Sequence, residues 1–239
     1  MPDITAHRAG TTLGTENSLQ ALAQSIAFGT PWAEIDVQLT ADGMVVVFHD
    51  ADLQRLTGDP RRVRDLAFSE LPSLPGGNRI PLLSEFIARA RGRIGLNIEL
   101  KDYGDGPPLA THVAEVLQAQ EFAAQALVCS FNPALTAVAK RTLPGLRVGL
   151  VQETASLPHE AFDFVSVAHH AIDNALVQEA HARGMTVHAW TVNDRERMRR
   201  LLAMDVDNVI TDNPAMGMET LRAFGSLKPW HRAWLRWRA

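Results

Sequence analysis

The side chains best suited to chemistry gather within the first hundred residues, each near the end of a short apolar segment. Glu34 and Asp36 lie in one such segment, Glu99 lies in a second, and His7 and His49 follow two others. A parallel α/β barrel places its catalytic residues at the carboxyl ends of its strands. Three carboxylates and two histidines in such positions predict a site for metal-assisted chemistry on a phosphate group.

One residue separates Glu34 from Asp36, so both side chains leave the same face of a strand. Two buried carboxylates repel each other and lose hydration unless a cation or strong donors offset the cost. Mg2+ and Ca2+ prefer oxygen ligands of this kind, and Glu99 supplies a third carboxylate. The sequence therefore predicts a divalent-cation site. Solvated acids beside a loop, or an ion pair between Glu99 and Lys101, are the alternatives.

Residues able to move protons and bind phosphate accompany these acids. Histidine titrates near neutral pH, so His7 and His49 could take a proton from an attacking oxygen and give one to a leaving oxygen. Arg8 and Lys101 could bind a phosphate and offset the charge of its transition state. Trp190 leaves two interpretations open: it fills the top of the barrel, or it forms an aromatic wall for the organic part of a substrate.

The elements that must position these residues alternate between strand-like and helix-like segments. Strands are expected near residues 5, 35, 97, 128, 149, 165, 189 and 209. Repeated strand–helix alternation implies a parallel sheet, and eight repeats in 239 residues predict a closed α/β fold, the TIM (β/α)8 barrel. We expect a single barrel domain over residues 1–225 and a tail over residues 226–239.

Turn and capping residues predict the details of this barrel. The Asp42-Gly43 turn predicts a hairpin between residues 33–39 and 44–48. Residues 51–81 are rich in proline and glycine and are expected to form a small surface insertion after the second strand. Asn17 is the expected N-cap of a helix over residues 18–28. Further helices are expected, among others, over residues 109–120 and 216–223.

Composition narrows the possible partners and the compartment. The net charge of −4 argues against nucleic-acid binding, which usually needs a basic surface. The single cysteine, Cys129, cannot form an internal disulfide and is expected in the core. No segment approaches the roughly 18 apolar residues of a membrane span, and no secretory signal is visible. These features predict a cytoplasmic protein, and the sequence leaves its oligomeric state open.

The tail from Lys228 onward combines aromatic and basic residues. Trp230, Trp234 and Trp237 have the i, i+4, i+7 spacing of one helix face. The tail could pack as a terminal helix on the barrel. Tryptophan beside lysine and arginine also suits the headgroup region of a bilayer, so weak contact with a membrane surface is the other interpretation.

Taken together, these motifs resemble the glycerophosphodiester phosphodiesterase family, in its order and approximate spacing, from residue 5 to about residue 222. The motifs that carry the resemblance are His7-Arg8, Glu16-Asn17, Glu34-x-Asp36, the Asp42-Gly43 turn, His49-Asp50, Glu99-x-Lys101, Trp190-Thr191-Val192-Asn193 and Thr211-Asp212-Asn213-Pro214. The chain departs from the family pattern where Ala9 precedes Gly10, at Thr15, and at Thr30-Pro31-Trp32 before the paired acids. These departures leave the alcohol portion of the substrate open.

The resemblance implies a compact, cytoplasmic TIM-barrel hydrolase that cleaves glycerophosphodiesters to sn-glycerol 3-phosphate and an alcohol. It implies one divalent cation, Mg2+ or Ca2+, bound by the residues that match the family's ligands, with a histidine acid–base pair, two phosphate contacts and an aromatic substrate wall. The matching residues are Glu34, Asp36 and Glu99 for the metal, His7 and His49 for proton transfer, Arg8 and Lys101 for phosphate, and Trp190 for the wall, with Glu16 and Asn17 supporting them from behind.

Two other functions compete with this hydrolase. The first is a lysophospholipase D-like enzyme that cleaves lysophospholipid headgroups at a membrane surface, which the tryptophan-rich tail and the altered loops favour. The second is a binding module that keeps the pocket without turnover. The loss of a carboxylate or a histidine would favour the binding module, and all of these side chains are present.

Overall fold

Eight parallel strands close into a barrel in the computed structural model, which describes residues 2–228. The strands of the barrel are β1 (Asp3–Ala6), β2 (Trp32–Leu39), β4 (Gly95–Leu100), β5 (Ala126–Ser130), β6 (Arg147–Gln152), β7 (Phe164–Ala168), β8 (Thr186–Trp190) and β9 (Asn208–Thr211). Strand β1 closes the ring, because it pairs in parallel with both β2 and β9. The predicted TIM barrel is therefore confirmed. The tail tryptophans Trp230, Trp234 and Trp237 lie outside the described residues.

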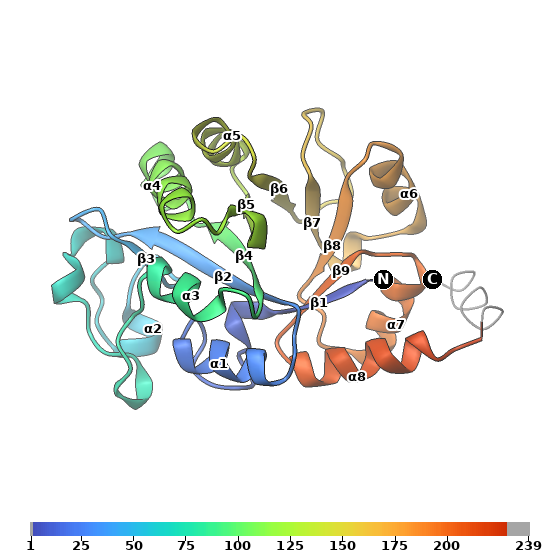
Figure 1. The fold of residues 1–239 in the computed structure, drawn as a ribbon, viewed down its shortest axis with the longest axis horizontal. Helices are drawn as coiled ribbons and strands as arrows, with labels where there is room; N and C mark the ends of the chain where they lie inside the picture. The colour runs from blue at the N-terminus through green and yellow to red at the C-terminus, as the bar shows by residue number, and fades with distance from the viewer. Residues whose placement is uncertain (1, 229–239) are drawn as a thin grey trace.

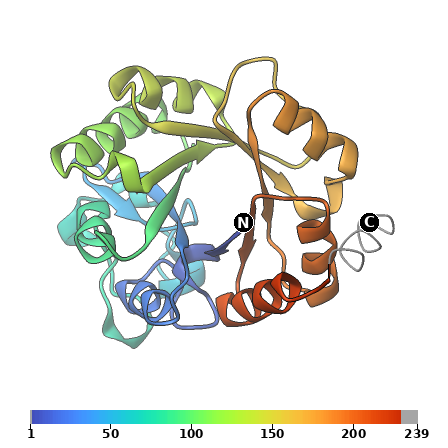
Figure 2. The same cartoon turned by 45° about the vertical axis from the view of Figure 1, so that its right-hand side comes forward.

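Helices surround the ring of strands, as Figure 2 shows. They are α1 (Leu19–Ala27), α3 (Leu83–Ala90), α4 (Gly106–Ala119), α5 (Pro133–Thr142), α6 (Asn174–Ala182), α7 (Arg195–Ala203) and α8 (Pro214–Gly225). Within the described chain, residues 153–163 cross from β6 to β7 without a helix. None of the helices over residues 2–228 has the length and apolar character needed to cross a membrane.

Three helix starts differ from the sequence-based expectation. The N-cap of α1 is Ser18, whose side chain accepts from a backbone N–H (3.1 Å), and not Asn17. Asn17 has a φ of 54° and turns its amide toward the barrel instead. Helix α4 begins at Gly106 and α8 at Pro214, both earlier than expected. Prolines occupy the first turn of both helices, where a missing N–H costs no hydrogen bond.

The hairpin and the insertion lie to one side of the barrel (Figure 1). Strand β3 (Val45–Val47) pairs antiparallel with β2, as the Asp42-Gly43 turn predicts. The insertion that follows contains α2 (Gln54–Thr57) and several short 3-10 turns. It is more than a surface excursion, because its apolar side chains form a small core together with two side chains of the hairpin, Val46 and Phe48. That core contains Val46, Phe48, Leu53, Val63, Leu66, Leu74 and Ile80.

The barrel interior is tightly filled around Phe164. Its ring stacks on His188 at 4.5 Å, and a Cβ built on Gly149 would lie 2.3 Å from that ring. We expect Gly149→Ala to lower the free energy of unfolding by about 1–3 kcal/mol, because the ring has no space to move. Urea denaturation measures the change. Gly145→Ala is the control, since nothing lies within 4 Å of a Cβ there. Equal stability of the two variants would contradict the prediction.

Candidate active site

A pocket of about 270 Å3 opens at the carboxyl ends of the barrel strands. Its lining includes every residue predicted to contact substrate or metal, namely His7, Arg8, Glu34, Asp36, His49, Glu99, Lys101 and Trp190. These residues come from β1, β2, β3, β4 and β8 or from the turns directly after them. The fold thus brings the predicted residues together in one cavity.

The three predicted carboxylates form a compact cluster at the centre of this pocket. Glu34 and Asp36 point inward from β2, and Glu99 is the register partner of Asp36 on β4. Each residue offers an oxygen within 4.8 Å of the others. Glu34 and Asp36 are only 4% and 1% exposed. The arrangement follows from the two-residue period of a strand and from the pairing of β2 with β4.

The electrostatics of this cluster favour a bound cation. Burial and the charge of Asp36 raise the pKa of Glu34 to about 8. Burial likewise raises the pKa of Glu99 despite the adjacent Lys101. Burial opposes ionisation of Asp36 too, but Lys101 and His49 outweigh it and lower the pKa of that carboxyl. Two buried carboxylates and a partly buried third, close enough to disfavour ionisation of one another, form an oxygen donor set that fits a divalent cation such as Mg2+ or Ca2+.

Both histidines have one ring nitrogen held by an aspartate. His7 Nδ1 lies 2.7 Å from Asp212 Oδ1, and His49 Nδ1 lies 2.6 Å from Asp50 Oδ1. With Nδ1 engaged in this way, Nε2 is the nitrogen left for the pocket, and His7 Nε2 lies 3.9 Å from Glu34 Oε2. Holding one imidazole nitrogen fixes the ring orientation and the tautomer. The two imidazoles therefore have the arrangement that proton transfer in a pocket requires.

Asp212 is held firmly in place beside His7. Its carboxylate accepts from Thr11 Oγ1 (2.9 Å) and from Asn193 Nδ2 (2.5 Å). The hydrogen bond with His7, together with those from Asn193 and Thr11, lowers the pKa of Asp212 to about 2 despite its partial burial. Burial alone would lower the pKa of His7, but Asp212 and the charge of Glu34 outweigh it and raise that pKa.

Sequence reasoning did not pair Asp212 with His7, since 205 residues separate them. The pairing depends on barrel closure, which places Ala6 opposite Thr211 in the β1–β9 register. An acidic residue directly after the last strand of a closed barrel lies beside the end of the first strand. That position is the feature from which the contact could have been predicted.

We expect Asp212→Asn to lower kcat by about 100-fold or more, since an amide holds imidazole in a different tautomer. Steady-state hydrolysis of a glycerophosphodiester measures the loss. Asp207→Asn serves as the matched control, because Asp207 contacts a histidine on the outside of the barrel, His181, at 2.8 Å. An Asp212→Asn enzyme as active as that control would show that the contact has no catalytic consequence.

The two cations of the pocket also contact the carboxylate cluster. Lys101 Nζ lies 2.7 Å from Glu99 Oε1 and 3.4 Å from Asp36 Oδ1. Arg8 Nε lies 3.8 Å from Asp36, and the Arg8 backbone N–H donates to Glu34 Oε2 at 2.7 Å. Both side chains are partly accessible from the pocket. The pocket therefore carries positive groups beside the acids, as recognition of an anionic phosphate requires.

Glu16 and Asn17 lie behind the lining residues. Glu16 Oε1 accepts from Arg8 Nη1 at 3.0 Å, and Asn17 Nδ2 donates to Asp36 Oδ2 at 2.9 Å. The Asn17 side-chain oxygen also accepts from the Asp36 backbone N–H. This use of the Asn17 amide explains why the next residue, Ser18, caps helix α1. Both residues thus hold pocket side chains in position and do not face the cavity.

One side of the pocket is aromatic. Trp190 and Phe131 make an edge-to-face contact with ring centroids 5.7 Å apart, and Trp190 Nε1 donates to the Ser166 carbonyl at 3.0 Å. Phe131 is 48% exposed and was not predicted to belong to the site. It follows β5 at the same end of the barrel as the other pocket residues, and its position there was the available indication. Cys129 is buried, as expected, in the lining of the pocket, and burial raises the pKa of its thiol.

Comparisons with known proteins agree with this geometry. The sequence model of the glycerophosphoryl diester phosphodiesterase family matches residues 7–216. A glycerophosphodiester phosphodiesterase from Caldanaerobacter subterraneus is 28% identical over 242 residues, which cover 93% of this chain and 98% of the relative. A human lysophospholipase D is 34% identical over 111 residues, covering 40% of this chain and 35% of that protein.

A solved structure with the same fold is that of a phosphodiesterase from Oleispira antarctica in complex with its product, sn-glycerol-3-phosphate. It is similar with a TM-score of 0.85 and 28% identity, over 93% of this chain and 97% of that one. The family match spans most of the barrel, and both full-length similarities extend over nearly all of the chain. The chain therefore belongs to the glycerophosphoryl diester phosphodiesterase family, a family of phosphoric diester hydrolases.

Proposed function

We propose that this protein hydrolyses glycerophosphodiesters to sn-glycerol 3-phosphate and an alcohol. The observation that carries the proposal is one pocket that combines a carboxylate cluster, two cations and two aspartate-held histidines. The product-bound Oleispira antarctica structure, with the same fold, supports the glycerol 3-phosphate portion of the substrate. A small-molecule substrate also agrees with the size of the pocket.

The proposed cofactor is one divalent cation, Mg2+ or Ca2+, held by Glu34, Asp36 and Glu99. When bound, such a cation supplies positive charge that polarises a phosphate oxygen and stabilises charge developing at phosphorus. Their oxygen donors, two buried and one partly buried, lie within 4.8 Å of one another and support this assignment. The two ions differ in size and preferred ligand number, so metal-dependence measurements distinguish them.

The side chains of the pocket carry the remaining steps. Arg8 and Lys101 bind non-bridging phosphate oxygens and stabilise the charge that grows on them during attack. One imidazole, of His7 or His49, takes the proton of the attacking hydroxyl as the new P–O bond forms. The other imidazole donates a proton to the alcohol oxygen as the old P–O bond breaks. If water is the nucleophile, this step gives glycerol 3-phosphate directly. If the substrate's own glycerol hydroxyl is the nucleophile, the step first forms a cyclic phosphate, and water then opens this ester to give glycerol 3-phosphate.

Trp190 is the proposed wall against the organic part of the substrate, and exposed Phe131 extends the same surface. This apolar surface also supports the second candidate function, lysophospholipase D-like cleavage of lysophospholipid headgroups, since an acyl chain would lie against it. The partial similarity to a human lysophospholipase D also supports this second function. Membrane contact through Trp230, Trp234 and Trp237 and a cytoplasmic location stay predictions.

Parallel assays on two substrates test the proposed function. Glycerol 3-phosphate release from glycerophosphocholine is measured with EDTA, Mg2+ or Ca2+, beside lysophosphatidic acid release from lysophosphatidylcholine. Metal-dependent release from the first substrate is the expected result, and the active ion identifies the cofactor. Cleavage of the lysophospholipid alone would favour the second function. An inactive protein on both substrates would contradict both.

A further inference from the structure

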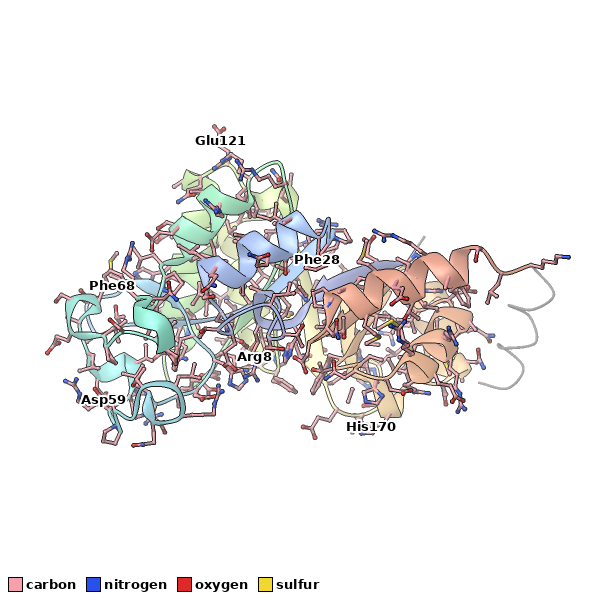
Figure 3. The ribbon with its side chains drawn as sticks, turned by 90° about the horizontal axis from the view of Figure 1, so that it is seen from below. Arg8, Phe28, Asp59, Phe68, Glu121 and His170 are labelled. Carbon is pink, nitrogen blue, oxygen red and sulfur yellow. The ribbon has the colours of Figure 1, made fainter. Side chains whose placement is uncertain are left out.

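Arg55 links the insertion to two carboxylates beside the active-site pocket. It lies in α2, and its Nη1 and Nη2 donate to the two oxygens of Glu16 at 3.0 and 2.5 Å. Its Nε donates to Asp50 Oδ2 at 2.6 Å. One planar guanidinium therefore holds two separate carboxylates. In Figure 3, Asp59 and Phe68 mark the insertion, and Arg8 lies further toward the middle of the molecule.

Each of these carboxylates also holds a residue of the pocket. Glu16 Oε1 accepts from Arg8 Nη1 at 3.0 Å, and Asp50 Oδ1 lies 2.6 Å from His49 Nδ1. Arg8 follows β1 and His49 follows β3, and these two strands do not pair with each other. Strand β2 pairs with both, so the backbone connects them only indirectly, and the contacts of Arg55 add a direct link between the side chains that hold Arg8 and His49.

We propose that Arg55 is a positioning residue whose guanidinium sets the spacing between Arg8 and His49. The roles of those two residues in phosphate binding and proton transfer rest on the proposed function. Through Arg55, the insertion forms part of the active-site structure, because it fixes the side chains on which the reaction geometry depends. Displacing a reacting group by about 1 Å costs roughly 100-fold in rate.

The contacts of Arg55 are suited to positioning more than to folding. The side chain is 46% exposed, and exposed ion pairs contribute about 0–1 kcal/mol to stability. The insertion has its own anchor in buried apolar side chains such as Leu53, Val63 and Ile80. We therefore expect the fold to persist without Arg55, while Glu16 and Asp50 lose the group that holds them together.

Lysine cannot replace arginine here. A guanidinium presents donors in a rigid planar fork, and Arg55 uses three of its nitrogens at once, whereas an ammonium is a compact point charge on a flexible stem. Arg55→Lys keeps the charge and loses the fork. Its activity thus separates a requirement for positive charge from a requirement for geometry.

The test compares Arg55→Ala and Arg55→Lys with Arg61→Ala, after the wild-type protein has been assayed on glycerophosphocholine. Arg61 lies in the same insertion, but its ion pair is with Asp59, away from the pocket lining. We expect kcat/KM of Arg55→Ala to fall by about 100-fold, with kcat lowered and KM raised. We expect kcat/KM of Arg55→Lys to stay reduced and that of Arg61→Ala to equal the wild-type value. Added guanidinium should restore part of the activity of Arg55→Ala, whereas sodium chloride of equal ionic strength should not.

A readout without substrate keeps this inference separate from the proposed function. Nitrogen chemical shifts report the tautomer of each imidazole, and we expect Arg55→Ala to shift the His49 resonances while those of His181, on the outside of the barrel, stay unchanged. Unshifted His49 resonances would overturn the positioning role. So would wild-type kinetics of Arg55→Ala or Arg55→Lys, or a loss of activity that guanidinium leaves unrepaired. An inactive wild-type protein would count against the proposed function alone.

Discussion

Glu34→Ala is expected to abolish metal-dependent hydrolysis, lowering kcat/KM by about 1,000-fold. The substitution removes one of three oxygen donors and leaves Asp36 and Glu99 with a weaker hold on a cation. Because Glu34 is 4% exposed, water restores little of the lost coordination. Isothermal titration with Mg2+ and with Ca2+ measures the affinity, and steady-state kinetics measure the rate.

Glu34→Gln separates loss of the charge from loss of the hydrogen bond. Glu34 Oε2 accepts from the Arg8 backbone N–H at 2.7 Å, and glutamine keeps an oxygen that can accept it. Both variants should lose cation affinity, whereas only the alanine variant also frees the backbone at Arg8. Normal turnover of Glu34→Ala, or cation affinity equal to wild type, would show that the carboxylate cluster is not the metal site.

His49→Ala should lower kcat by about 100- to 10,000-fold, the usual contribution of a positioned acid or base. In contrast to Glu34→Ala, it should leave cation affinity nearly unchanged, because His49 is not one of the clustered carboxylates. Asp50 keeps its ion pair with Arg55, so the local structure has a remaining support. Rate measurements at saturating metal, together with titration of the cation, test both halves of the expectation.

His181→Ala is the matched control for this variant. His181 also pairs with an aspartate, Asp207, at 2.8 Å, but it lies on helix α6 outside the barrel. We expect its activity to equal that of wild type. If His49→Ala hydrolyses substrate as fast as His181→Ala, the proton-transfer role of His49 is wrong. If His49→Ala loses cation affinity together with its rate, His49 belongs to the metal site.

The barrel and the central carboxylates could be predicted from local sequence. Apolar strand segments that alternate mainly with helical ones predict a parallel sheet, because parallel neighbours need crossover connections. Eight such repeats in this length then predict that the sheet closes into a barrel. The spacing of Glu34 and Asp36 determines that they share a face, whatever the rest of the fold does. Glu99 lies on β4, the neighbour of β2, and Lys101 directly follows that strand, two positions after Glu99. These features depend on backbone periodicity, which a sequence displays directly.

The residues that hold the pocket side chains in place do so through contacts between distant segments. Only the tertiary structure shows which residues these are. Asp212 reaches His7 only because β9 pairs with β1 to close the ring. Arg55 reaches Glu16 only because the insertion folds back onto the pocket, 39 residues away along the chain. The sequence predicts Asn17 as a helix N-cap, but in the structure its side-chain amide binds Asp36 instead.

The physical reason for this division is the range of the interactions involved. The periodicity of a strand acts between residues two positions apart, so it can be read from the order of the residues. A hydrogen bond between side chains depends on distances of about 3 Å, which strand register, barrel closure and loop path set together. The sequence by itself therefore determined which groups could do the chemistry. Only the tertiary structure determined which side chains hold those groups in place.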